Sequence, residues 1–441
     1  MNIALAKTDT RREASDIFAA ARDRLPGTGN VAEARQQAFE AYTRAGLPHR
    51  RLEDWKYTDL RALMRDVLPL AAVPDSGALE RAKAALASLT AFDAHRLVLV
   101  DGVVAPALSD LSDLEAGLRV QTLREMLEDS SKDTRADLLE NGAASGAMIA
   151  LNAAMATDGA VITVADRAAL AKPIHIVHVA TRPSAATYTR SFLKLGQAAH
   201  ATLVESFVAA KDAKSYQTND AVTISLDKDA NLQHVRLMVD SADATNITTA
   251  IFSIGAKARL ATFNMTSGGS LSRYQGYLTF AGEGADVSAN GVNLLNGRQH
   301  ADTTLFLDHA VPHCASREVF RAVVDDRAHS VFQGRIIVQP KAQKTDAKMM
   351  TRALLLSDEA EADNKPELEI FADDVTCGHG ATTGALDESL LFYLRARGLS
   401  EKEAQALLIQ AFVGEAIESI ASDALREQAI VTAQRWLEAR G

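Results

Sequence analysis

Hydrophobic and polar positions change their period along the chain, and each period predicts a different kind of secondary structure. Residues 31–46 (VAEARQQAFEAYTRAG) place apolar side chains three and four apart with charges opposite, which predicts an amphipathic helix. Residues 96–104 (RLVLVDGVV) predict a hairpin that turns at Asp101 and Gly102. Because helical periodicity lies on both sides of this hairpin, we expect a mainly helical N-terminal region over residues 1–145.

From about residue 158 to residue 376 the period changes to two. Runs such as 172–180 (KPIHIVHVA) and 199–209 (AHATLVESFVA) are short, alternating and rich in β-branched residues, and each ends in turn residues. So many consecutive short strands predict a large sandwich, a barrel or a solenoid.

A weak internal repeat decides among these folds. A turn, a small residue and then alternating residues recur with alanines at positions 199, 230, 258, 285 and 328. The first three steps, of 31, 28 and 27 residues, are typical of stacked coils in which a small side chain fits each tight corner. The last step, of 43 residues, predicts an insertion around residues 294–314. We therefore expect a right-handed parallel β-helix over residues 146–385.

After the strands the helical period returns, which defines a C-terminal helical region over residues 386–441. Asp387 is a predicted N-cap, Ser400 and Glu403 form a predicted capping box, and Asp423 is the predicted N-cap of a third helix. The end of a solenoid needs a cover, so part of this region is expected to serve as a lid. Its large apolar side chains equally fit a pair of helices that binds a partner.

Composition narrows the choice of partner and compartment. The 441 residues carry a formal charge of −10 and no long basic block, which argues against nucleic acid or an anionic membrane as the main partner. The sequence contains no run of about 18 apolar residues, so no membrane span is predicted. The first residues lack the apolar core of a secretory signal. Two cysteines, Cys314 and Cys377, are too few for a disulfide scaffold. We therefore expect a cytoplasmic protein with reduced thiols.

The candidate chemistry lies in residues 373–384 (DDVTCGHGATTG). A phosphate loop is excluded because no Lys-Ser or Lys-Thr follows the last glycine, and a self-contained zinc finger is excluded because only two ligands lie close together. In a strand, Cys377 and His379 share a face. This geometry fits a catalytic thiol beside an imidazole, a two-ligand half-site for a soft metal, or an inert buried pair. The residues alone leave these three interpretations open.

Other polar residues carry weaker signals. Five histidines have no spacing typical of a ligand set, so ordinary structural positions are expected for His175, His178, His300, His309 and His313. A β-helical carbohydrate-active enzyme would need acids clustered on one face of the coils, often with calcium. The repeats offer three acids at turns that make no obvious set, namely Asp227, Asp229 and Asp286.

Several motifs are similar to those of the SufB/SufD family of iron–sulfur cluster assembly proteins. In the last third they are SVFQGRIIV (330–338), KAQKTDAK (341–348), LLLSDEA (354–360), KPELEIFADDVTCGHGATTGALDE (365–388) and LFYLRARG (391–398). Near the start, EDWKYTDLR (53–61) and LNAAMATDG (151–159) resemble weaker signatures of the family. The CGHGATTG segment, the Asp387-Glu388 that follows it and the scarcity of cysteine resemble the SufD branch rather than the SufB branch.

The resemblance implies a scaffold subunit without catalytic turnover. Such a subunit pairs with SufB through the β-helix edge and binds the ATPase SufC, which carries out ATP hydrolysis, through its C-terminal helices. The resemblance also implies that His379 and Cys377 are a metal half-site near the face that meets SufB. There they would help hold a transient iron–sulfur cluster shared with SufB. The residues implied for SufC docking are Leu391, Phe392, Tyr393, Leu394, Arg395, Arg397, Leu408 and Phe412.

Further expectations follow from an unpaired β-helix edge. Without SufB, such an edge could pair with a second copy of this chain, which predicts a homodimer of the isolated protein. Two rival functions remain beside the scaffold. One is a β-helical carbohydrate-active enzyme, and the other is a purely structural subunit whose Cys–His pair is inert.

Overall fold

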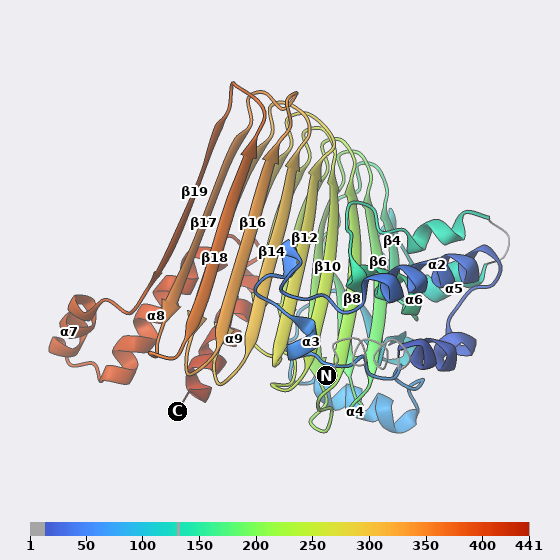
Figure 1. The fold of residues 1–441 in the computed structure, drawn as a ribbon, viewed down its shortest axis with the longest axis horizontal. Coiled ribbons are helices and arrows are strands. Elements are labelled where there is room, and N and C mark those ends of the chain that lie inside the picture. The colour runs from blue at the N-terminus through green and yellow to red at the C-terminus, as the bar shows by residue number, and fades with distance from the viewer. Residues whose placement is uncertain (1–13, 130–132, 441) are drawn as a thin grey trace.

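Two long sheets face each other and form the centre of the molecule (Figure 1). The structure is a computed structural model that describes residues 14–129 and 133–440, so most of the segment considered for a secretory signal lies outside it. Successive strands alternate between the two sheets, and the chain therefore winds as a solenoid. This architecture confirms the predicted parallel β-helix. Among the described helices, none combines the length and the apolar character needed to cross a membrane.

Strands of each sheet pair in register, one coil beside the next. The ten-stranded sheet contains, from its C-terminal edge, β19 (Thr376–Gly384), β17 (Asp346–Leu355), β15 (Ala315–Val324), β13 (Asp286–Leu295), β11 (Arg259–Thr266), β9 (Asn231–Met238), β7 (His200–Ala209), β5 (Ile174–Ala180), β1 (His95–Val100) and β2 (Val103–Val104). The nine-stranded sheet contains β18 (Glu361–Ile370), β16 (His329–Val338), β14 (His300–His309), β12 (Leu271–Phe280), β10 (Thr245–Ile254), β8 (Gln217–Leu226), β6 (Ala186–Leu195), β4 (Ala160–Val164) and β3 (Leu118–Thr122). Pairing is parallel except between β1 and β2 and between β3 and β4.

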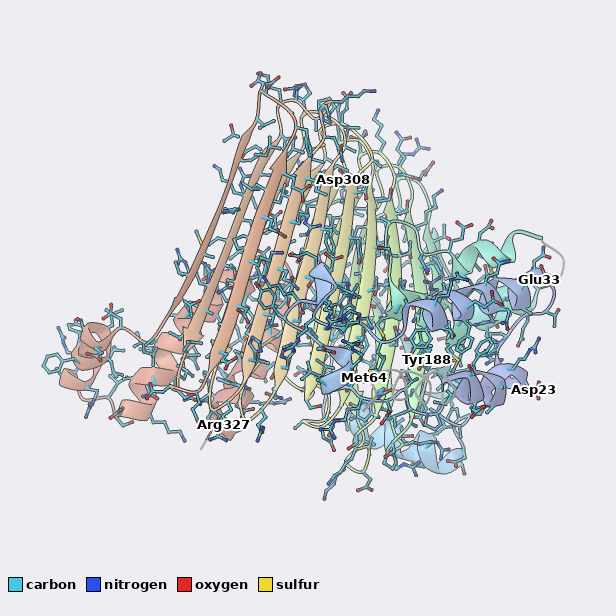
Figure 2. The ribbon with its side chains drawn as sticks, in the orientation of Figure 1. Asp23, Glu33, Met64, Tyr188, Asp308 and Arg327 are labelled. Carbon is cyan, nitrogen blue, oxygen red and sulfur yellow. The ribbon has the colours of Figure 1, made fainter. Side chains whose placement is uncertain are left out.

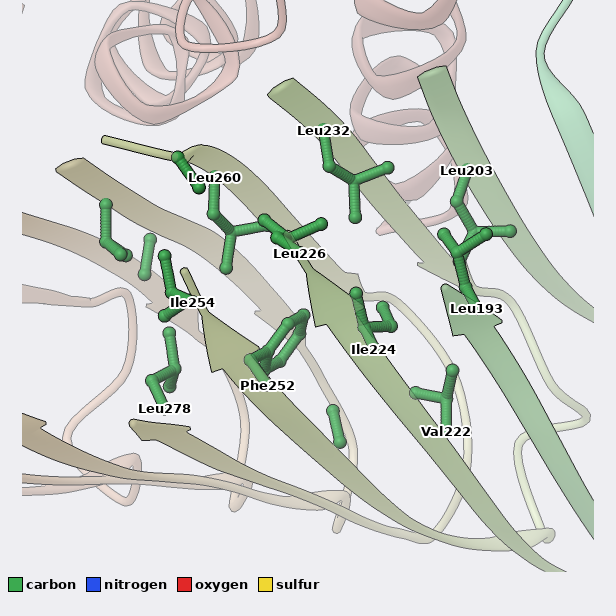
Figure 3. Close-up of a cluster of buried hydrophobic side chains, with 14 of the residues drawn as sticks. Leu193, Leu203, Val222, Ile224, Leu226, Leu232, Phe252, Ile254, Leu260 and Leu278 are labelled. Carbon is green, nitrogen blue, oxygen red and sulfur yellow. The ribbon is translucent and has the colours of Figure 1, made fainter. Parts of the chain in front are cut away.

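Alternate side chains of both sheets fill the space between them. Buried Leu, Ile, Val and Phe residues meet there, as Figure 3 shows around Leu226, Leu232 and Phe252. Because the coils are in register, each inward side chain packs on its counterparts in the coils before and after it. Burial of one such Leu or Phe side chain contributes roughly 1.5–3 kcal/mol. The solenoid is therefore stabilised by a continuous aliphatic column.

The corner residues explain the repeat and correct one part of it. Fully buried small residues precede β7, β9, β11 and β13, namely Ala199, Ala230, Ala258 and Ala285. The predicted insertion at 294–314 is wrong, because this segment contains the ordinary strand β14. Cys314 occupies the next corner of the ten-stranded sheet, before β15, whereas Ala328 precedes β16 in the other sheet. The residue before each of these ten-stranded-sheet corners has a positive φ, as seen at Ala198, Asp229, Lys257, Gly284 and His313.

The N-terminal helices cover the outer faces of the first coils. They comprise η1 (Arg22–Arg24), α2 (Asn30–Ala45), η2 (Glu53–Trp55), α3 (Leu60–Leu63), α4 (Ser76–Leu86), η3 (Pro106–Leu108), α5 (Leu123–Glu128), η4 (Asp133–Leu139) and α6 (Ala147–Met155). Helices α2 and α6 pack together and bury Tyr188, which is labelled in Figure 2, with Ile247 on the outside of the nine-stranded sheet. Helix α4 covers Val177 and Val179 on the other sheet. The expected helix at 31–46 and the hairpin at 96–104 are confirmed.

The segment around Trp55 anchors the N-terminal region to more distant coils. Trp55 is buried, and the guanidinium of Arg273 on β12 lies 3.8 Å from the centre of its ring. Arg273 also forms a buried ion pair with Asp302 on β14. The Thr58 hydroxyl lies 2.9 Å from Nε2 of His300. This mixed aromatic and basic segment is therefore used for packing within the chain.

The two ends of the solenoid differ. At the N-terminal end, β2 and β3 pair antiparallel with their neighbours, and Leu111, Leu114 and Val120 pack against the interior. At the C-terminal end, β18 and β19 are the outermost strands, and each has one neighbouring strand. Their side chains are half-buried or exposed. The first end is closed, and the last coil is an open edge (Figure 1).

The C-terminal helices lie along the side of the solenoid. Helices α8 (Glu401–Ile417) and α9 (Asp423–Ala439) bury their apolar faces on the outside of the ten-stranded sheet, and α8 contacts β13 and β15. The expectation that this region covers the end of the solenoid is therefore wrong, because the aliphatic stripe that attracts it runs along the outer face. The predicted caps of α7 (Glu388–Ala396) and α8 are confirmed. The N-cap of α9 is Ser422 rather than Asp423.

Candidate functional site

Cys377 and His379 lie on β19, the last strand of the ten-stranded sheet. The register aligns Cys377 with Ala347 and His379 with Met349 on β17. Ala347 and Met349 belong to the buried core between the sheets. Both side chains therefore point toward the inside of the last coil, as the alternation of a strand requires.

The backbone groups of the same two residues are directed at the free edge. The N–H of Thr376 donates to the carbonyl of Thr345 on β17 at 2.8 Å. Because successive residues of a strand direct their N–H and C=O groups to opposite sides, even-numbered residues of β19 face β17. Cys377 and His379 are odd-numbered, so their N–H and C=O groups point away from β17. An added parallel strand would form hydrogen bonds with them.

The neighbouring edge strand, β18, carries a proline at its centre. The N–H groups of Glu361 and Phe371 donate to the carbonyls of Ala328 and Val338, at 3.0 and 2.9 Å, so the odd-numbered residues of β18 face β16. Pro366 is even-numbered, and its missing N–H therefore falls on the free edge. Its presence costs the solenoid no internal hydrogen bond, and it leaves one gap in the row of donors at that edge.

The surroundings of Cys377 do not activate its thiol. The side chain is half-buried, whereas His379 is exposed. Burial raises the pKa of the Cys377 thiol, the Ala347 N–H lowers it by less, and the charges of Asp346 and Glu318 raise it again. A nucleophilic cysteine needs a lowered pKa. The interpretation as a catalytic thiol is therefore not favoured.

The chain does not complete a metal site around this pair in the part that the structure describes. Among those residues, the one group of three or more close His, Cys, Asp or Glu ligand atoms contains neither Cys377 nor His379. Cys314 is buried at a corner two coils away, where its thiol lies 3.5 Å from the carbonyl oxygen of Gly282. The assignment of Cys377 and His379 as a half-site stays a prediction, and any further ligands would have to come from elsewhere.

A second candidate surface is the projecting helix α7 with the start of α8. No residue of α7 is buried, and Phe392 and Tyr393 are 74% and 54% exposed. Of the eight residues expected to dock a partner, the half-buried ones are Leu391, Leu394, Leu408 and Phe412. The guanidinium of Arg397 lies 5.0 Å from the ring centre of Tyr393. Large exposed apolar groups of this kind are typical of an interaction site.

Most of the remaining histidines have structural partners. His175 lies 2.9 Å from the hydroxyl of Ser206, and His309 lies 3.1 Å from that of Ser316. His178 differs, because it lies with Glu205 and Asp220 in a fully buried group of potential ligands. Sequence analysis missed this group because its members come from β5, β7 and β8. Only the register of the coils brings them together.

Comparisons with known proteins match almost the whole chain. The family model described as "SUF system FeS cluster assembly, SufBD core domain" matches residues 178–412, and the model of the SufBD protein N-terminal region matches residues 11–176. The iron–sulfur cluster assembly protein SufD of Escherichia coli is 32% identical over 399 residues, which cover 90% of each chain. A SufBD family protein of Synechocystis is also 32% identical, over 88% of this chain and 86% of its own. SufD of Bacillus subtilis is 25% identical over 65% of this chain and 66% of its own.

Proposed function

The chain belongs to the SufBD family of iron–sulfur cluster assembly proteins, and we propose that it is a non-catalytic scaffold subunit that pairs with SufB and binds the ATPase SufC. The observation that carries this proposal is the open C-terminal edge of the solenoid. It presents Cys377 and His379 at the place where an added strand would bind.

Pairing with SufB would use the free edges of β18 and β19. Both edge strands are long, with ten and nine residues, and such unpaired edges are templates for strand addition. Ile370 and Phe371 at the end of β18 are 41% and 59% exposed. A second β-helix placed against this end would bury those side chains and continue the interior column.

A nascent cluster would be held between the two subunits. Cys377 and His379 supply at most two ligands, whereas iron–sulfur clusters usually take four from protein. The missing ligands would come from SufB across the edge. His379 is the stronger candidate ligand, because it is exposed while burial keeps Cys377 protonated.

SufC would dock on α7 and the adjoining part of α8. Leu390, Phe392, Tyr393 and Leu407 are each about half exposed or more, which is unusual for large apolar residues on a lone surface helix. Aromatic anchors of this kind carry most of the energy of many interfaces. ATP hydrolysis would then belong to SufC.

The rival functions have less support. The acids considered for a carbohydrate-active enzyme lie at separate turns, and Asp227 pairs with Lys194 at 3.8 Å. They are not part of a close group of ligands in the described residues. A purely structural subunit with an inert Cys–His pair is distinguished from the scaffold by the experiment below.

The test is a purification without oxygen of the tagged chain from cells that also produce its own SufB and SufC. We expect a complex whose native mass includes one SufB, one copy of this chain and ATPase subunits. In the same complex, His379→Ala should reduce the amount of cluster assembled, while Thr383→Ala, an inward residue of the same strand, should not. Recovery of the chain without partners would contradict the scaffold. A normal cluster yield from the His379→Ala complex would favour the inert pair.

A further inference from the structure

The interior of the solenoid has two parts. One is the aliphatic column of Figure 3, and the other is lined by buried polar side chains. Strands of the nine-stranded sheet begin with polar inward residues, such as Asp220 on β8, and strands of the ten-stranded sheet end with them. His178 on β5 and Glu205 on β7 meet Asp220 in this polar part. Exposed fractions are 7% for His178, 0% for Glu205 and 1% for Asp220.

Each of these three side chains has one polar atom without a hydrogen-bond partner. The atoms are Nε2 of His178, Oε1 of Glu205 and Oδ2 of Asp220. One ligand atom from each residue lies within 4.8 Å of the others. Leaving a buried polar group unpaired costs roughly 1–3 kcal/mol, and more when it is charged. An unpartnered atom on every member of one close ligand group indicates an occupant that satisfies them.

The other polar atom of each side chain is already hydrogen-bonded, which leaves the unpartnered atom available to bind an ion. Asp220 Oδ1 accepts a hydrogen bond from the Thr189 hydroxyl at 2.5 Å, and this uses the only proton of that hydroxyl. Thr189 Oγ1 can then only accept from Nδ1–H of His178, at 3.4 Å. His178 Nε2 is left with its lone pair, which is the form that binds metals. The imidazole is also stacked on the Phe207 ring, with centroids 4.3 Å apart.

Glu205 is oriented in the same manner. Its Oε2 is 2.7 Å from Nε2 of His234, and its Oε1 remains open. Hydrogen bonds from outer residues to the second atoms of the ligands are the usual support of a metal site.

The nearby guanidinium of Arg236 forms no hydrogen bond with the carboxylates. The guanidinium of Arg236 donates to Asn264, Asn246 and Thr248 at 2.9, 2.8 and 2.7 Å, and all three acceptors are neutral. His234 meets only Oε2 of Glu205, so Oε1 of Glu205 and Oδ2 of Asp220 remain without a partner in the described part of the chain. A buried unpaired carboxylate oxygen is costly, so a proton or a cation is favoured there.

We propose that His178, Glu205 and Asp220 bind one divalent first-row transition-metal ion inside the solenoid. One imidazole nitrogen and two carboxylate oxygens suit Mn²⁺, Fe²⁺, Co²⁺ or Zn²⁺, whereas Ca²⁺ takes six to eight oxygens and Cu⁺ prefers thiolate. Bonds of about 2.0–2.2 Å place the ligand atoms of such a site roughly 3.4 Å apart. The three side chains would therefore move closer together on binding the ion. The site is separate from the open edge and does not depend on the proposed function.

Cobalt is the probe that tests this site. The full chain carrying Cys377→Ala and His379→Ala, so that the exposed pair cannot contribute, is produced in medium supplemented with Co²⁺ and desalted. We expect one tightly held Co²⁺ per chain by elemental analysis, with visible d–d absorption. His178→Gln and Asp220→Asn should retain at least tenfold less cobalt. Thr189→Val should bind it about 10–100-fold more weakly, because the support of two ligands is lost.

Matched controls separate binding from general damage. Asp240→Asn removes a buried carboxylate that hydrogen-bonds Tyr216 and Asn246, and His309→Gln removes a buried imidazole in a distant coil. Both should keep the cobalt. Absence of cobalt from the parent chain would overturn the proposal in favour of a shared proton. Equal cobalt content in Asp220→Asn and Asp240→Asn would place the ion elsewhere. If the ligand variants fail to fold, the isosteric Thr189→Val decides.

Discussion

The two ends of the solenoid are made from the same kind of coil and finished in opposite ways. At the N-terminal end, the β1–β2 hairpin, the antiparallel strand β3 and Leu111 and Leu114 fill the end of the column. At the C-terminal end, β18 and β19 stop without a cover. The helices that follow pack along the side and leave this edge free. An uncovered edge of this kind can accept a further strand, whereas the other end of the same solenoid is covered.

Two buried glutamates, one near each end, also differ in their hydrogen-bond partners and in the direction of their pKa shifts. Burial raises the pKa of Glu205, but the hydrogen bond and charge of His234, with the charge of Arg236, hold it below the ordinary value. In the register, Glu318 on β15 is aligned with Met349 on β17, which is aligned with His379 on β19. The two oxygens of Glu318 have no hydrogen-bond partner within the described residues, and burial raises its pKa to about 8. Glu205 thus has an imidazole partner at 2.7 Å, whereas neither oxygen of Glu318 has one among the described residues.

The largest expected effect contrasts one leucine at each end. Leu99→Ala should lower the free energy of unfolding by about 2–5 kcal/mol, because Leu99 is fully buried in the closed end. Leu368→Ala, in the half-buried β18, should cost only about 1 kcal/mol in the isolated chain. Urea unfolding of the two variants measures both. Equal losses in the isolated chain would contradict an open C-terminal end.

The stability of variants at the two buried glutamates, Glu318 and Glu205, should depend differently on pH. Because the folded-state pKa of Glu318 is raised to about 8 from 4.5, the unfolded chain binds fewer protons between these values, and stability falls as the pH rises through this range. Glu318→Gln should remove that fall, and its advantage should grow to the order of a few kcal/mol by pH 8. Glu205→Gln should instead destabilise at pH 7, because it breaks the pair with His234. Denaturation midpoints across the pH range decide, and a pH-independent Glu318→Gln difference would refute the assignment.

A double variant on α7 tests the proposed docking of SufC independently of the free edge of β18 and β19. Phe392→Ala combined with Tyr393→Ala should weaken SufC binding by about 2 kcal/mol, or roughly thirtyfold, since exposed aromatic anchors dominate many interfaces. Thermal stability should stay within about 0.5 kcal/mol of the parent, because neither side chain is buried. Val73→Ala, which alters a 61% exposed residue elsewhere, is the control. Calorimetric titration with purified SufC gives the affinities, and unchanged binding would move the docking site away from α7.

The smallest effect concerns the free edge of β19. Ala381→Pro removes an N–H that points at this edge, and should weaken association with SufB, or with a second copy, by about tenfold while the chain stays folded. Thr382→Pro removes an N–H that points at β17, and should lower the stability of the isolated chain more than Ala381→Pro does. Sedimentation and urea unfolding distinguish the two outcomes. Equal behaviour of the two variants would show that β19 does not present the assumed edge.

Much of the fold could be predicted because its signals are local. The alternation of apolar residues and the small corner residues such as Ala199 and Ala230 are properties of single coils, and they predicted the stacked strands correctly. The helix at 31–46 and the caps at Asp387 and Ser400 are equally local. The resemblance of the last third of the chain added the family, which the comparisons confirmed.

The features that were predicted wrongly or missed depend on relations between coils rather than on single coils. Ala328 was assigned to the corner column that Cys314 occupies, because an alanine at the end of either sheet looks the same along the chain. The expected lid was wrong because the apolar stripe on the outside of the ten-stranded sheet is spread over many strands. The buried group of His178, Glu205 and Asp220 was missed for the same reason. The roles of Cys377 and His379 stay predictions, since the described residues complete no ligand set around them.

The stacking of coils in register has a consequence for cooperativity. In such an array each coil is stabilised by its intrinsic energy and by its two neighbours, much as in a one-dimensional chain of coupled units. The coil of β18 and β19 has one neighbour, so its opening should require less free energy than that of any central coil. Amide hydrogen exchange should then be fastest around Cys377 and His379 in the isolated chain. A partner that stacks there would supply the missing neighbour, so the site would become rigid only in the assembled complex.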